Sequence, residues 1–377
     1  MIYLDNAATT MPCETALAAA AKANTEVFCN PSSLYRAGLD AENLITSARE
    51  SVASALSVPA ERIFFTSGAT EANNLALRGV FEANRKRRPR IVISAVEHAS
   101  VYETARFLES EYGAEVVDIP TNSKGEYDPD DIVSSCDERT CLVSMMTVNN
   151  ETGNILPTGR VFSQLKRRFP DIITHTDAVS SFMKIKMKAA DISADMITVS
   201  GHKIRSVKGC GALYIKKGVK LIPQICGGGQ ESGMRSGTEN VPAIYAFGET
   251  VKAEKAGIDT AYKNAEILIG GFAEKLKTLP YIAINSAEER SPYILNFSVS
   301  GIRSEIMLHF LESKGILVSS GSACSKGAIS EVLENFRVPK QNIDSAIRVS
   351  LSRTSVPGDL EALFYALREG YSSLRRS

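Results

Sequence analysis

Residues 196–215 read MITVSGHKIRSVKGCGALYI and give the first indication of the fold. The β-branched run at 196–199 is bounded by Ser200-Gly201, which is typical of a buried strand that ends abruptly. The polar residues after it, including Lys203, would then lie at the carboxyl edge of a sheet, before glycines lead back into a second apolar run. A lysine held there can act as a base or a Schiff-base amine. By itself, Lys203 also fits an ordinary surface lysine.

Strand-like runs recur through the first half of the chain, and most are separated by segments with helical periodicity. They lie at residues 62–65, 90–95, 115–119, 141–148, 172–176 and 196–199. Strands that alternate with helices predict βαβ units and a mostly parallel sheet with helices on both faces. Before these strands, Asp40 is predicted to cap a helix that runs to about residue 57.

The length of 377 residues exceeds one typical core, so we expect two domains. A helix-compatible stretch at 242–279 contains no internal proline and would connect them. The strands near 293–299 and 346–350 and the helices near 305–314 and 359–374 predict a smaller α+β unit. We therefore expect an α/β fold, with a large domain at residues 15–250 and a small α+β domain formed by residues 1–14 and 251–377.

Composition excludes several classes of function. Lys+Arg and Asp+Glu both number 43, so the chain offers no charge imbalance that would attract nucleic acid or an anionic membrane. No apolar run approaches the roughly 20 residues of a membrane span, and the first residues do not resemble a signal peptide. The seven cysteines lack CxxC spacing and the four histidines lack HxxxH spacing. We expect a cytoplasmic protein with no metal, no direct nucleic-acid partner and no membrane contact.

Chemically related side chains follow the ends of successive predicted strands, where open α/β sheets bind ligands. Residues 66–71 form a small-residue turn that opens a helix and suits a phosphate. His98, Asn150, Asp177 and Lys203 follow four further strands. Each of these features also has an ordinary structural explanation. Residues 66–71 fit a common strand-to-helix turn, His98 could cap a helix, and Asp177 could start a turn. Together they match pyridoxal 5'-phosphate, which needs a lysine, a carboxylate for its pyridine nitrogen and phosphate donors.

Characteristic strings occur in order along nearly the whole chain, from Tyr3 to about Arg353. They are IYLDNAATT, NPSS, TSGATEANN, EHAS, VNNETG, THTDAV, SGHK, KGCGALYI, GGGQESGMRSGTENVP, SSGSAC and IRVSLSR. These strings resemble the class V group of fold-type I pyridoxal phosphate enzymes, and most closely the cysteine desulfurases of the NifS/IscS type. The combination of SGHK, GGGQESGMRSGT and SGSAC in this order is highly specific.

The resemblance implies roles for the matching residues. Lys203 would bind the cofactor as a Schiff base, Asp177 would pair with the pyridinium nitrogen, and His98 would stack on the ring and shuttle protons. The further cofactor-binding residues would be Ala69, Thr70, Asn150, Ser180, Ser200 and His202, with Thr238 supplied by the second subunit of a homodimer. The substrate-binding residues would be Asn30, Asn150 and Arg348, whose guanidinium fork suits a carboxylate.

Cys324 lies in a run of small residues at 319–327, which predicts a flexible loop that presents an exposed thiol. The resemblance implies that L-cysteine is converted to L-alanine while the Cys324 thiolate takes the sulfur as a persulfide. A sulfur-acceptor protein would then receive it, for iron–sulfur cluster assembly or for thiolation of tRNA or a cofactor.

The sequence departs from the family pattern at a few positions. Ser180 replaces a usual glutamine and Ser206-Val207 a usual Gly-Pro, while Tyr35, Ser232 and Ser352 also differ from the common residues. These departures bear on substrate preference, rate and partner choice. The alternatives are a selenocysteine lyase or class V aminotransferase on the same fold, or a poorly active dimeric scaffold for a sulfur acceptor. A transaminase would have no use for Cys324.

Overall fold

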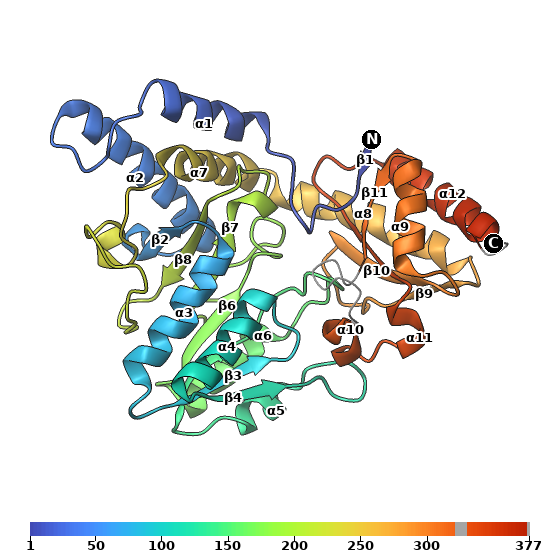
Figure 1. Cartoon of the computed structure of the whole chain (residues 1–377), viewed down its shortest axis with the longest axis horizontal. Coiled ribbons are helices and arrows are strands. Elements are labelled where there is room, and N and C mark those ends of the chain that lie inside the picture. The colour runs from blue at the N-terminus through green and yellow to red at the C-terminus, as the bar shows by residue number, and fades with distance from the viewer. Residues whose placement is uncertain (321–329, 375–377) are drawn as a thin grey trace.

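The computed structural model describes residues 1–320 and 330–374, and it contains two main sheets that lie side by side (Figure 1). The larger sheet has seven strands, and only β8 runs antiparallel to its neighbours. Their order is β2 (Ile63–Thr66), β8 (Gly211–Ile215), β7 (Met196–Ser200), β6 (Ile173–Asp177), β5 (Thr140–Ser144), β3 (Arg90–Ser94) and β4 (Glu115–Ile119). The expected mostly parallel α/β sheet is confirmed.

Alternating strand residues explain why helices cover both faces of this sheet. Ile91 and Ile93 pack in one apolar cluster with α3 (Ala69–Asn84) and α4 (Ala99–Tyr112), whereas Val92 packs in the cluster on the opposite face. That second face is covered by α2 (Arg36–Leu56), α5 (Pro129–Ser134), α6 (Thr158–Arg168) and α7 (Val241–Lys255).

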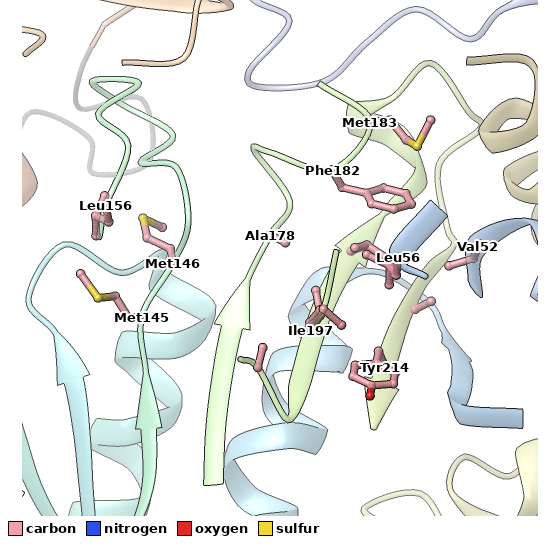
Figure 2. Close-up of a cluster of buried hydrophobic side chains, with 14 of the residues drawn as sticks. Val52, Leu56, Met145, Met146, Leu156, Ala178, Phe182, Met183, Ile197 and Tyr214 are labelled. Atoms are coloured by element: carbon pink, nitrogen blue, oxygen red, sulfur yellow. The ribbon is translucent and has the colours of Figure 1, made fainter. Parts of the chain in front are cut away.

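Figure 2 shows part of this second cluster, where Val52 and Leu56 of α2 lie beside Ile197 and Tyr214 of the sheet. Phe182 lies above the strand ends in the same view. The strands are therefore buried on both sides, and their free carboxyl ends remain as the edge where polar groups can gather.

The smaller sheet is antiparallel and has its own apolar cluster. Its order is β12 (Ser319–Ser320), β13 (Ala346–Ser350), β10 (Ile294–Val299) and β9 (Ile282–Ile284), packed against α8 (Ile258–Lys277), α9 (Ser304–Ser313) and α12 (Pro357–Leu374). Leu4 and Ala7 belong to this cluster, and β1 (Ile2–Tyr3) pairs with β11 (Ile316–Leu317). This shared burial supports our proposed division into residues 15–250 and residues 1–14 with 251–377.

Shorter elements complete the chain. They are α1 (Glu14–Thr25), α10 (Glu331–Asn335), α11 (Lys340–Ile343) and the 3-10 turns η1 (Ala60–Arg62), η2 (Gly201–Lys203) and η3 (Glu231–Gly233). None of the helices within residues 1–320 and 330–374 combines the length and apolarity that a membrane crossing requires.

The helix-compatible stretch at 242–279 forms two helices, α7 and α8, with a break around Gly257. Arg353 occupies this break: its Nη2 donates to the Glu254 carbonyl at 2.8 Å, and its Nε pairs with the Glu254 carboxylate at 2.6 Å. A Cβ on Gly257 would lie 3.1 Å from the same guanidinium. A partner so distant in the sequence leaves no local pattern from which the break could be predicted.

Two other predicted boundaries shift. The helix assigned to an Asp40 cap begins at Arg36, because the turn at 30–33 packs on its first residues. There a Cβ on Gly38 would lie only 2.3 Å from the Ser33 carbonyl oxygen. The strand expected over 141–148 ends at Ser144, and the following residues leave the sheet to form part of the cavity described next.

Candidate active site

A cavity of about 620 Å³ opens at the carboxyl ends of β2, β3, β5, β6 and β7. This volume lies within the range of small-molecule and cofactor sites. The residues predicted for the site come together on its wall: Ala69, Thr70, His98, Asn150, Asp177, Ser180, Ser200, His202, Lys203 and Arg348.

Three predicted residues are not on this wall. Thr238 lines an adjoining hollow of about 130 Å³ together with Ser67 and Gly209. Asn30 is exposed in the turn before α2, where its Oδ1 accepts from the Ser32 amide at 2.9 Å. Cys324 lies outside the described residues. The roles of these three residues stay predictions.

The phosphate end of the predicted site is the N-terminus of α3. The first bond of this helix runs from the Ala72 amide to the Gly68 carbonyl, so the preceding amides point out of the helix end. Gly211 of β8 makes this turn possible, because a Cβ there would lie 2.7 Å from the Gly68 backbone. The Ser200 hydroxyl at the end of β7 is buried and has no hydrogen-bond partner within the described residues. An anion at this point would supply one.

Asp177 ends β6 and is held by two donors. Its Oδ2 accepts from Asn73 Nδ2 at 2.8 Å, and its Oδ1 accepts from the Val179 amide at 2.9 Å. Asn73 is fully buried on α3, one turn after Thr70. Asn73 lies within the TSGATEANN string, but no role was predicted for it from the sequence. Its amide fixes the carboxylate that faces the cavity.

His98 is both a helix cap and a residue of the cavity wall. It is the N-cap of α4, and its Nδ1 accepts from the Ser100 amide at 3.1 Å. Because a backbone amide can only donate, a neutral His98 carries its proton on Nε2. Asn73 donates to the Ser100 hydroxyl at 2.8 Å, so Asp177, Asn73, Ser100 and His98 form one connected chain.

Lys203 ends η2, directly after β7, and its amine contacts the N-terminal segment of the chain. Lys203 Nζ donates to the carbonyls of Ala7 at 2.5 Å and Ala8 at 2.8 Å. The neighbouring His202 approaches the Thr9 hydroxyl at 3.2 Å through Nδ1. Burial lowers the pKa of His202 to about 4, and the positive charge of Lys203 acts in the same direction. The ring is therefore neutral at pH 7.

Arg348 enters the cavity from β13 of the smaller sheet. Its Nη2 donates to Asp5 Oδ1 at 2.8 Å, and its Nη1 donates to the Asn150 carbonyl at 3.0 Å. The side chain is only 7% exposed. Its Nε is buried and has no partner in the part of the chain that the structure describes. The guanidinium is thus fixed in place and already binds one carboxylate, which is the chemistry that a substrate carboxylate would need.

Three ionisable residues near the site, the buried Glu97 and Lys184 and the half-buried Glu151, were not predicted as functional candidates from the sequence. Burial raises the pKa of Glu97 to about 8, aided by the charge of Asp177, while its Oε1 accepts from Ser94 and from the Met146 amide at 2.7 Å. Burial lowers the pKa of Lys184 to about 7, with Lys203 and Arg348 adding to the effect. Burial raises the pKa of Glu151 to about 7 against the opposing hydrogen bond from Ser330. Glu97 and Glu151 lie in quoted strings, whereas Lys184 had no such signal.

The departures from the family pattern have different surroundings. Ser180 lies on the cavity wall. Ser206 is fully buried behind Lys203, where its amide donates to the Gly201 carbonyl at 3.1 Å, and the preceding Arg205 has a left-handed φ of 71°. Val207 packs against the core. The loop that replaces Gly-Pro is therefore a tight turn anchored in the interior.

Within residues 1–320 and 330–374, no group of three or more His, Cys, Asp or Glu side chains is arranged to hold a metal ion.

The comparisons with known proteins define the class. The family model of the class V aminotransferases matches residues 2–363, and the chain belongs to this family. Its members use pyridoxal 5'-phosphate as cofactor.

Individual relatives are similar over nearly their full length. "Cysteine desulfurase IscS" from Methanosarcina thermophila is 35% identical over 99% of this chain and 93% of that protein. "NifS/IcsS protein homolog" from Lactobacillus delbrueckii subsp. bulgaricus is 37% identical over 98% of this chain and 97% of that protein. A solved structure described as a NifS-like protein is 33% identical, with a TM-score of 0.92 and complete coverage of both chains.

Proposed function

We propose that this chain is a pyridoxal phosphate-dependent cysteine desulfurase that converts L-cysteine to L-alanine and transfers the sulfur through Cys324. The observation that carries the proposal is the meeting of Lys203, Asp177 and His98 from the large sheet with Arg348 from the small sheet in one cavity. The near full-length similarity to proteins named cysteine desulfurase supports the same activity.

The residues present fit the cofactor. The buried Ser200 hydroxyl, partnerless among the described residues, and the N-terminus of α3 together form an anion-binding end. Asp177 offers a carboxylate to the same cavity, and Asn73 fixes it. Lys203 would carry the cofactor covalently. When bound, pyridoxal phosphate supplies an electron sink for bonds at the substrate α-carbon.

The protein groups then bind, orient and move protons. Arg348 would hold the α-carboxylate of L-cysteine through its guanidinium N–H groups, beside the Asn150 carbonyl that also accepts from it. His98 would give or take a proton at Nε2, because its Nδ1 is committed to the Ser100 amide. The neutral His202 would donate a hydrogen bond without adding charge.

Cys324 would act as the sulfur-accepting nucleophile. Ser320, four residues before it in the sequence, ends β12, which pairs with β13 so that Ser319 lies opposite Arg348. Ser330, six residues after it, donates to Glu151 Oε2 at 2.7 Å. Both ends of the intervening segment are thus attached near the cavity, which supports delivery of the Cys324 thiolate to the substrate sulfur.

The proposal extends to partners and location. A sulfur-acceptor protein would take the persulfide sulfur for iron–sulfur cluster assembly or thiolation of tRNA or a cofactor. A homodimer is supported by large exposed apolar side chains gathered in one N-terminal region, namely Met11, Leu17, Phe28, Leu34, Tyr35 and Leu39. Thr238 would complete the partner's phosphate site. The free thiols of the six described cysteines agree with a cytoplasmic location.

The experiment compares Cys324→Ser with wild type and with Cys226→Ser, a control at another free cysteine, which is exposed. Alanine and sulfide are measured from L-cysteine with a reductant, and the cofactor is followed by its visible absorbance. We expect Cys324→Ser to keep the absorbance and lose sulfide release, whereas Cys226→Ser releases sulfide as wild type does. Unchanged sulfide release in Cys324→Ser would contradict the persulfide role. Protein that never acquires the absorbance would favour the scaffold alternative.

A further inference from the structure

The N-terminal segment Asp5–Thr10, which we call the strap, connects the two sheets beside the cavity. In Figure 1 it is the blue chain that runs from β1 on the side of the small sheet towards α1. Asn6 Nδ2 donates to the Ser350 carbonyl at 2.9 Å, and the Ala7 amide donates to the Ser350 hydroxyl at 2.8 Å. At its other end, the Thr10 amide donates to the His202 carbonyl at 2.9 Å. The strap is therefore held on both sides of the site.

Two active-site groups bond to this strap. Asp5 pairs with Arg348, and the carbonyls of Ala7 and Ala8 accept from the Lys203 amine. The Asp5 side chain is 20% exposed, so the ion pair is mostly shielded from water. The residue proposed to bind the substrate and the residue proposed to bind the cofactor thus share one short segment.

The Asp5 carboxylate has the same chemistry as the α-carboxylate of an amino acid. Both accept hydrogen bonds from guanidinium N–H groups and both neutralise its charge. Burying the Arg348 guanidinium without a counterion would be costly, and Asp5 provides that counterion in the substrate-free protein. An arriving amino acid meets a guanidinium whose charge is already matched.

We propose that Asp5 is a built-in carboxylate ligand of Arg348, which competes with the substrate carboxylate and thereby sets amino-acid affinity. Asp5 is a positioning residue, since it acts through Arg348. The inference rests on the proposed role of Arg348 in binding the substrate carboxylate. Because Asp5 belongs to the strap, its exchange for a substrate carboxylate also loosens that segment.

The first test titrates the cofactor-loaded enzyme with L-alanine, the proposed product, and follows the visible absorbance to obtain a dissociation constant. Asp5→Asn keeps the size of the side chain and removes its charge. We expect L-alanine to bind about three- to tenfold more tightly to this variant, as expected when a partly buried competing charge is removed. Asp259→Asn, which removes the carboxylate of the exposed Lys186–Asp259 pair, serves as the control and leaves the constant unchanged.

The variant Arg348→Gln distinguishes the proposed role of Arg348 in substrate binding from the proposed competition by Asp5. If it binds L-alanine as wild type does, the proposed role of Arg348 is wrong. If Arg348→Gln binds weakly while Asp5→Asn binds no more tightly than wild type, the competition alone is wrong.

A second measurement needs no substitution, so it remains decisive even if Asp5→Asn fails to fold. Hydrogen–deuterium exchange of the peptide that contains residues 4–10 is compared with and without saturating L-alanine. We expect faster exchange of its amides in the presence of L-alanine, because Asp5 leaves Arg348. In a folded Asp5→Asn variant this ligand-dependent difference disappears. Exchange that is unchanged or slowed by L-alanine in wild type would overturn the inference.

Discussion

The cavity has two walls, and they are held in different ways. On the wall formed by the large sheet, Asp177 and His98 are joined through Asn73 and Ser100. Asp177 ends β6, Asn73 lies on α3, and His98 and Ser100 lie at the start of α4. On the opposite wall, Arg348 is fixed by Asp5 from the other end of the chain. Lys203 stands between them, because its backbone follows β7 while its amine contacts the strap.

The two walls suit two different tasks, namely holding the cofactor and binding the substrate. The large-sheet wall is preorganised by buried contacts between elements of one core, so it suits a cofactor that remains bound. The opposite wall depends on an ion pair and a strap whose bonds can be exchanged, which suits a substrate that enters and leaves. Substitutions in the first wall should therefore change cofactor affinity, and substitutions in the second should change amino-acid affinity.

The largest effect is expected for Lys203→Ala, which removes the amine that would bind the cofactor and that contacts the strap. We expect loss of the visible absorbance of the bound cofactor and a fall in turnover of at least about 10²- to 10⁴-fold, the range for a lost proton-transfer group. Lys208→Ala, at the exposed second lysine of the cavity wall, should keep the absorbance. Absorbance retained in Lys203→Ala would show that another amine binds the cofactor.

A smaller effect is expected for Asn73→Ala, which removes one hydrogen bond to the Asp177 carboxylate. Hydrogen bonds to charged groups contribute about 1.5–3 kcal/mol, so cofactor affinity should fall about 10- to 100-fold when apoprotein is reconstituted in equilibrium dialysis. L-alanine affinity of the saturated variant should stay unchanged, because Arg348 is untouched.

The neighbouring Asn74→Ala is the matched control for this change, since Asn74 bonds the Thr70 carbonyl of its own helix. Equal losses of cofactor affinity and amino-acid affinity in Asn73→Ala would break the distinction between the two walls.

A third effect concerns protein stability instead of ligand binding and is expected for Glu97→Gln. The folded-state pKa of Glu97 is about 8, above the ordinary value of 4.5, so between these values the folded protein binds more protons than the unfolded chain. The free energy of unfolding of wild type should therefore fall as the pH rises from 5 to 8. One proton contributes at most about 1.4 kcal/mol per pH unit.

Glutamine does not titrate, so this component should be absent from Glu97→Gln, and the variant should gain stability relative to wild type as the pH rises. Urea unfolding at pH 5.5, 7 and 8.5 measures the difference, with the exposed Glu26→Gln as control. Parallel pH profiles for wild type and Glu97→Gln would show that Glu97 does not change its protonation in this range.

The sequence by itself determined the large sheet and most of the cofactor wall. Apolar runs such as residues 196–199 alternate with helical periodicity, and this pattern is a local property of the chain. Parallel strands bring their carboxyl ends to one edge, so His98, Asp177 and Lys203 could be predicted to lie near each other without knowing any contact. In the structure, these three residues lie on the wall of one cavity, as the strand order led us to expect.

Only the tertiary structure decided how these side chains are held. The bond from Lys203 to the Ala7 carbonyl uses a backbone group that has no sequence signature. The Asp5–Arg348 pair and the helix break around Gly257 join residues far apart in the chain. Likewise, the shifted pKa of Glu97 follows from burial, which depends on everything packed around it. Periodicity and motifs are properties of short stretches of the sequence. Counterions, burial and strap contacts exist only once distant segments have packed together.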